Sequence, residues 1–105
     1  MLTQNTVIKT VENYAKEITQ AGISLRKVIL FGSFAKGTQH EWSDIDVALV
    51  ADDFTGVGFL DTPRFSRINI RKPYTRIESI TYPTDYFQES DPFIEEIKNT
   101  GIEIM

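Results

Sequence analysis

Apolar residues near the start of the chain recur at three- and four-residue intervals. This spacing predicts an amphipathic helix, whose buried face would consist of Val7, Val11, Tyr14, Ala15 and Ile18. Thr3 or Asn5 can cap the start of this helix, and Gly22 suits its C-terminal end.

Shorter apolar runs rich in β-branched residues predict strands. Three such runs cover residues 26–31 ("RKVILF"), 44–50 ("DIDVALV") and 74–83 ("YTRIESITYP"), and "IEIM" at 102–105 suggests an edge strand.

Turn and capping residues between these runs predict further short helices. "GSFAKG" at 32–37 predicts a turn into a short helix closed by Gly37, followed by a polar loop. Asp61 and the proline two residues later predict a helix start, with Phe65 and Ile68 facing the core. "TDYF" predicts one helical turn, and "DPFIEEIKNTG" predicts a helix capped by Asp91.

Composition and charge narrow the class of protein. The 105 residues fit one domain, residues 1–105, and 41% hydrophobic with 25% charged residues is typical of a globular chain. The chain has no cysteine, no apolar stretch of the roughly 18–20 residues that span a bilayer and no signal-peptide core, so a cytoplasmic location without a membrane is expected. A formal net charge of -4 argues against nonspecific nucleic-acid binding, but it leaves room for an anionic ligand held by a metal ion.

Two aspartates open the apolar run at 44–50. Residues two apart on a strand point to the same face, so the carboxylates of Asp44 and Asp46 would repel each other unless a cation lies between them. Hard carboxylate oxygens suit Mg²⁺, which is commonly bound by one or two carboxylates together with substrate phosphates. The alternative is a solvated strand end, where aspartate is common.

A Gly-Ser turn follows the apolar run at 26–31. Gly32 lets the backbone approach a ligand closely, and the hydroxyl of Ser33 can donate to a phosphate oxygen. Alone, the pair would only be a strand-to-helix turn. Beside a metal-binding pair of carboxylates, it suggests a triphosphate site.

The combined stretch resembles the signature of the polymerase-β-like nucleotidyltransferase superfamily, and the whole chain resembles its minimal nucleotidyltransferase domains. The matching residues are Gly32, Ser33, Ala35, Gly37, Ser43, Asp44, Ile45, Asp46 and Val47. The resemblance implies an α/β (α+β) fold, in which a small mixed β-sheet is flanked by helices. It also implies transfer of a nucleoside monophosphate, usually AMP from ATP, to an acceptor.

The same resemblance implies roles for individual residues. Asp44 and Asp46 would be shared ligands of two Mg²⁺ ions, and Gly32 and Ser33 would bind the nucleotide phosphates. The third carboxylate would be Glu78, a position where many members have Asp, and it would ligate metal and assist deprotonation of the acceptor. The alternative for Glu78 is an exposed strand carboxylate facing Arg76.

The resemblance further implies a partner. Stand-alone minimal nucleotidyltransferases are typically paired with a small helical HEPN-type protein, as the antitoxin half of a toxin–antitoxin pair. The interface is expected at Phe54, Phe59 and Leu60 and at the basic residues between Arg64 and Arg76, with core packing and solvated charge as the alternatives. A catalytically silent module that binds nucleotide or partner with the same fold is the alternative function.

Three residues near the signature remain. Lys36 could approach the triphosphate, and His40 is expected to face solvent. Trp42 is expected to pack the polar loop onto the domain, with contact to the nucleotide as the alternative.

Overall fold

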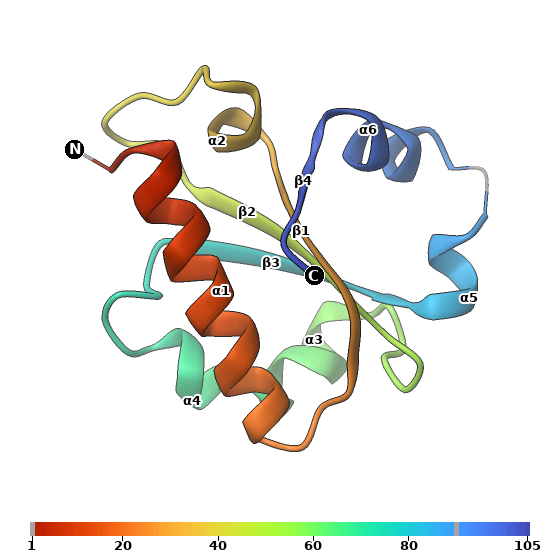
Figure 1. Ribbon diagram of the computed structural model, residues 1–105. Helices are drawn as coiled ribbons and strands as arrows, with labels where there is room; N and C mark the ends of the chain where they lie inside the picture. Colours follow the sequence, from red (N-terminus) through yellow and green to blue (C-terminus); the bar gives the residue numbers. More distant parts are fainter. Residues whose placement is uncertain (1, 90) are drawn as a thin grey trace.

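The computed structural model describes residues 2–89 and 91–105 as helices on both faces of one sheet (Figure 1). The helices are α1 (Gln4–Gln20), α2 (Ser33–Lys36), α3 (Gly58–Asp61), the 3-10 helix η1 (Thr62–Arg64), α4 (Ser66–Asn69), α5 (Thr84–Phe87) and α6 (Pro92–Thr100). The strands are β1 (Leu25–Phe31), β2 (Ile45–Ala51), β3 (Ile77–Pro83) and β4 (Ile102–Glu103).

The sheet is mixed and has the strand order β3-β2-β1-β4. β1 is antiparallel to both of its neighbours, whereas β2 and β3 run parallel. The parallel pair requires a crossover, which the segment containing α3, η1 and α4 provides. The predicted fold class, a small mixed sheet flanked by helices, is confirmed.

The first face of the sheet is covered by α1 and the crossover. The predicted apolar face of α1 is buried in the larger core cluster, together with Phe34 of α2 and Phe65 and Ile68 of the crossover. Thr3 caps the helix, and its side chain accepts a hydrogen bond from the backbone N–H of Thr6. In Figure 1, α1 lies across the sheet with its N-terminal end beside the loop that leads into β2.

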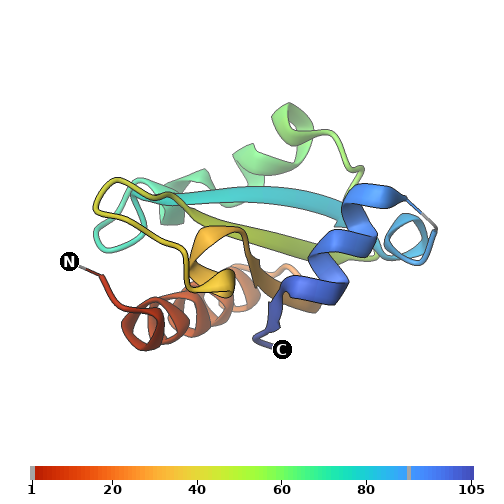
Figure 2. The ribbon, with the colours of Figure 1, turned by 90° about the horizontal axis from the view of Figure 1, so that it is seen from above.

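The second face carries α5 and α6, seen at the right of Figure 2. Ile94 and Ile97 of α6 pack with Phe87 of α5 against side chains of β1 and β2. Asp91 caps α6 as predicted, accepting hydrogen bonds from the backbone N–H groups of Phe93 and Ile94. This helix is therefore fixed both by its own cap and by an apolar core.

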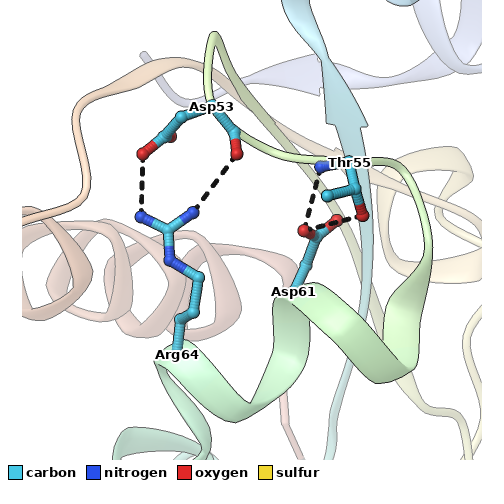
Figure 3. A network of polar contacts seen from close by, with 4 residues as sticks. All are labelled: Asp53, Thr55, Asp61 and Arg64. Carbon is cyan, nitrogen blue, oxygen red and sulfur yellow. Dashed lines mark hydrogen bonds and ion pairs between the residues drawn. The ribbon is translucent and has the colours of Figure 1, made fainter.

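The crossover agrees with the sequence-based prediction only in part. Asp61 is the N-cap of the 3-10 helix η1, and the proline two residues later lies at an early helical position, as predicted. Asp61 is also the last residue of α3, and its buried side chain does not cap η1. Its carboxylate accepts hydrogen bonds from the backbone N–H and the hydroxyl of Thr55 (Figure 3). It also accepts hydrogen bonds from the backbone N–H of Gly56 and from the hydroxyl of Thr81. Four donors to one buried carboxylate explain why this acid is tolerated inside the protein.

The third strand is shorter than predicted, because residues 74–76 form a turn that leads into Ile77. Tyr74 is buried, and its hydroxyl donates to Glu17 of α1. The first residue of the predicted strand therefore packs against α1 and is not part of the sheet. In the part of the chain that the structure describes, the helices are all too short or too polar to cross a membrane.

Candidate active site

The five predicted site residues come together at one end of the sheet. Phe31, the last residue of β1, pairs with Asp46, and Asp46 pairs with Glu78 of β3. Gly32 and Ser33 follow directly after Phe31, and Asp44 lies two residues before Asp46. Three neighbouring strands therefore deliver the Gly-Ser turn, the aspartate pair and the glutamate in that order across the sheet.

The carboxylates lie on the face of the sheet that carries α6. Asp46 is half-buried between the fully buried Ile45 and Val47, whose side chains belong to the α1 face. Ala48, two residues further along β2, is buried in the α6 cluster instead. Because side chains alternate along a strand, Asp46 shares the face of Ala48.

Gly32 is shaped by its contact with Asp46. Its φ of +73° and ψ of -152° are a combination that residues with a Cβ rarely adopt. A Cβ at this position would also overlap the carboxylate of Asp46 and lie 3.1 Å from its Cγ. Glycine is therefore required both by the backbone conformation and by the close approach of the carboxylate.

Electrostatics also couple the carboxylates. Partial burial raises the pKa of Asp46, and the negative charges of Asp44 and Glu78 raise it further. Each effect disfavours the ionised form, so the cluster is a place where a cation would be stabilised.

The carboxylates form an acidic cluster and not a preassembled cage. Within residues 2–89 and 91–105, no three His, Asp or Glu side chains are already gathered closely enough to hold one metal ion. The donors are nevertheless hard oxygens on adjacent strands, which is the chemistry that Mg²⁺ prefers. Glu78 and Asp44 are exposed, so their side chains can turn toward an ion without unpacking the core.

The helix α6 borders the site, which the sequence did not indicate. Lys36 of α2 makes an ion pair with Glu96 of α6 at 3.5 Å. The ring of Phe93 meets Phe31 edge-on at a centroid separation of 5.8 Å. These contacts join residues about 60 positions apart in the sequence, so no local pattern could have identified them.

Arg76 has a role that the sequence did not suggest. Its side chain donates hydrogen bonds to the backbone carbonyls of Glu41, at 3.0 Å, and of Ser43. The alternative in which Arg76 serves as the partner of Glu78 has no support among these contacts. Arg76 instead fixes the loop immediately before Asp44.

Of the remaining predictions for residues around the site, some are confirmed and others are wrong. His40 is exposed, as predicted, but Trp42 does not pack onto the domain: its side chain is 80% exposed. Phe54 is buried in the core, which excludes it from an interface, whereas Phe59 and Leu60 are exposed. Arg64 and Arg71, from the basic cluster, make ion pairs with Asp53 and Glu17 (Figure 3 shows the first pair).

Comparison with known sequences identifies a family and a relative that both match nearly the whole chain. Residues 8–102 match the model of the family described as "Nucleotidyltransferase domain". A protein of Methanocaldococcus jannaschii named "putative protein adenylyltransferase" is 29% identical over 101 residues, which are 93% of this chain and 98% of that protein.

Comparison with solved structures shows the same fold. A crystal structure described as "a putative nucleotidyltransferase from Sulfolobus solfataricus" aligns with a TM-score of 0.70 and 22% identity, covering 95% of this chain and 80% of that one. A structure described as "the toxin-antitoxin with AMP-PNP" aligns with a TM-score of 0.63 and 21% identity, covering 90% and 72%. At these identities the likeness concerns the fold.

Proposed function

This chain belongs to the nucleotidyltransferase domain family, and from that membership we propose that it transfers AMP from ATP to an acceptor hydroxyl. In this reaction the acceptor oxygen forms a bond to the α-phosphorus, the bond from that phosphorus to the bridging oxygen breaks, and pyrophosphate leaves with that oxygen. Such transfers need positioning and charge neutralisation more than covalent chemistry by the protein. The small acidic cluster and the adjoining Gly-Ser turn are suited to this task.

The observation that carries the proposal is the pairing of Asp46 with Glu78, with Gly32 against the carboxylate of Asp46. Two acids beside Asp46 repel its negative charge, which raises its pKa and destabilises the folded protein when all three are ionised. A sheet end with a purely structural role would gain nothing from this repulsion, whereas a bound cation and triphosphate would explain it.

The donor set supports Mg²⁺ as the cofactor, with two ions expected. Asp44, Asp46 and Glu78 would be its ligands, and bound Mg²⁺ supplies neutralisation of the phosphate charge. Ser33 would donate its hydroxyl to a phosphate oxygen, and the backbone of Gly32 would help to hold the phosphates. Glu78, on the outer strand of the pair, would take the proton of the acceptor hydroxyl.

We propose a protein as the acceptor and the cytoplasm as the site of the reaction, with residues 1–105 forming one nucleotidyltransferase domain. The name of the M. jannaschii relative and the toxin–antitoxin neighbour both favour a protein over a small molecule. A small helical HEPN-type protein is the proposed partner, with this chain as the antitoxin. The exposed Phe59 and Leu60 of α3 are suited to such an interface, since large apolar side chains are enriched there.

The test uses ATP radiolabelled on either the α- or the γ-phosphate. Tagged protein recovered from its own host is incubated with each label and Mg²⁺, and co-purifying proteins are examined by electrophoresis and mass spectrometry. We expect a partner to gain the α label as AMP, and to gain nothing from the γ label. Asp46→Asn serves as the control that should abolish labelling while the protein stays folded.

Two results would contradict the proposal. Labelling by the γ-phosphate would indicate a kinase-type transfer. Metal-dependent ATP binding without transfer to any protein or small molecule would favour the alternative, a silent nucleotide- or partner-binding module of the same fold.

A further inference from the structure

The turn before the aspartate pair holds a tryptophan out in water. Trp42 is the only tryptophan in the chain, and its side chain is 80% exposed. A single exposed apolar residue is common on protein surfaces and by itself indicates nothing. The contacts that hold this residue, however, distinguish it from the other exposed side chains.

Hydrogen bonds within the turn fix its backbone. The N–H of Ser43 donates to the carbonyl of His40 at 3.0 Å, and the N–H of His40 donates to the hydroxyl of Ser43 at 2.9 Å. The N–H of Trp42 donates to Nδ1 of His40 at 3.2 Å. Trp42 is therefore exposed on an ordered turn and not on a loose loop.

Arg76 ties this turn to the third strand. Its guanidinium reaches the carbonyls of Glu41 and Ser43, the two residues on either side of Trp42. The carbonyl of Arg76 accepts the N–H of Ile45 at 2.9 Å, so the same residue also aligns the start of β2. The tryptophan consequently has a fixed backbone position relative to both β2 and β3.

Trp42 is close in the chain to the carboxylates, and like Asp44 it is exposed. Burial alternates from Ser43 through Val47: Ser43, Ile45 and Val47 are buried, whereas Asp44 is exposed and Asp46 is half-buried. Asp44 and Asp46 therefore share a face. Trp42 belongs to the turn that precedes this extended stretch, and its exposed side chain starts from a backbone position two residues before Asp44.

The Trp42 turn and the phosphate-binding turn lie on opposite sides of the aspartates. Gly32 and Ser33 follow β1, on one side of the aspartates, while Arg76 holds the Trp42 turn from the β3 side. A triphosphate whose terminal phosphates lay at Gly32 and whose α-phosphate lay at the carboxylates would extend its nucleoside toward that other side. In both Figure 1 and Figure 2 the loop before β2 lies at the end of the sheet where β3 begins.

We propose that Trp42 is the surface on which the nucleobase of the bound triphosphate stacks. This inference rests on the proposed function and adds to it the residue that binds the base. An indole offers a flat aromatic face, and stacking between a base and an aromatic side chain is favourable for any base. Because every base has a flat face, this contact gives affinity for the base without strong selection among bases.

The single tryptophan makes the test direct. Purified protein with Mg²⁺ is titrated with ATP and, separately, with inorganic triphosphate, while indole fluorescence and calorimetric heat are recorded. We expect ATP to quench the fluorescence to saturation, and inorganic triphosphate to bind without quenching.

Variants supply the second measurement. Trp42→Ala should weaken ATP binding about tenfold, which corresponds to about 1.4 kcal/mol, and leave the affinity for inorganic triphosphate unchanged. Trp42→Phe should retain most of the ATP affinity, because the flat ring is kept. Ile70→Ala, which shortens another highly exposed apolar side chain (76% exposed), is the control and should not alter either affinity.

The outcomes separate the inference from the proposed function. If the wild-type protein binds neither ligand, the proposed function itself fails. If ATP binds with equal affinity to the wild type and Trp42→Ala, and without quenching, the stacking role is wrong while the transferase role stands. If Trp42→Ala keeps its ATP affinity but no longer modifies a partner, the indole contacts the acceptor protein, and the base-stacking inference is likewise overturned.

Discussion

Replacing Asp46 with asparagine should make the ligand-free protein more stable while removing its function. The substitution keeps the shape of the side chain and removes one of three neighbouring negative charges. Partial burial and the charges of Asp44 and Glu78 raise the pKa of Asp46. The folded state therefore favours the protonated carboxyl, and its stability falls as the pH rises through the folded-state pKa.

The magnitude follows from the sheet geometry. Alternate residues on a strand and paired residues on adjacent strands bring carboxylates to about 5–7 Å from one another. Two unit charges at about 6 Å, with an effective dielectric constant of about 40–80, repel by about 0.7–1.4 kcal/mol. Since Asp44 and Glu78 are exposed and screened by water, we expect a net gain of about 1 kcal/mol. For a domain of this size that is a rise of roughly 4–8 °C in Tm.

The assay is thermal unfolding at low ionic strength and neutral pH, repeated with Mg²⁺ and ATP. Mg²⁺ with ATP should stabilise the wild type and leave Asp46→Asn almost unchanged. The advantage of the variant should shrink in high salt and on acidification below the ordinary aspartate pKa of about 3.9, where the wild-type carboxyl is protonated as well. Asp85→Asn, an exposed site on α5, makes the same change in net charge and is the matched control. A ligand-free Asp46→Asn protein that unfolds at a lower temperature, or one that Mg²⁺ still stabilises, would refute the reasoning.

Three other substitutions test the surroundings of the site. Gly32→Ala should lower the free energy of unfolding by roughly 2 kcal/mol or more, because of the positive φ and the overlap with Asp46, and it should abolish transfer. Denaturant unfolding measures the stability and the labelling assay measures the transfer. A wild-type value in either measurement would contradict the close contact between Gly32 and Asp46. Asp61→Asn should cost about 2–4 kcal/mol at neutral pH, because donors of the buried carboxylate lose their acceptor. Burial opposes ionisation of Asp61, but the hydrogen bonds to its carboxylate outweigh burial and lower its pKa. The stability that the ionised carboxylate contributes is therefore lost on acidification. If the difference in free energy of unfolding between wild type and Asp61→Asn, measured in urea, did not shrink as the pH falls, this account would be wrong. Arg76→Gln should loosen the turn and raise the mobility of Trp42, seen as lower fluorescence anisotropy; an unchanged anisotropy would show that the turn holds itself.

The helices and the first half of the site were predictable because their signals are local. The capping threonine of α1, the Asp91-Pro92 start of α6 and the period of the apolar residues all lie within a few positions of the structure that they specify. Asp44 and Asp46 are placed on one face by strand geometry alone. The resemblance to the family supplied Glu78, and the pairing of β2 with β3 brings it beside Asp46.

The failures arose where a side chain is satisfied by distant partners. Asp61 and the nearby proline correctly predict the start of η1. The sequence does not reveal that the carboxylate of Asp61 accepts hydrogen bonds from Thr55, Gly56 and Thr81, the last of them 20 residues away. Trp42 was expected to pack inward because a large apolar ring usually does. Its turn is held by Arg76, 33 residues beyond Ser43, and no local sequence pattern reveals that contact.

The parallel pairing of β2 with β3 has a consequence for when the protein can first work. Between Ala51 and Ile77 the chain must fold a crossover of 25 residues (76 − 51 = 25) before Glu78 can lie beside Asp46. Non-local parallel pairing is slow compared with the closure of the local β1–β2 connection. If Glu78 has the role proposed for it, a chain still being synthesised presents the Gly-Ser turn and the aspartate pair without the glutamate, and it is inert at that stage. Transfer would then begin only after the crossover has docked, so neighbouring proteins would not meet a half-formed transferase.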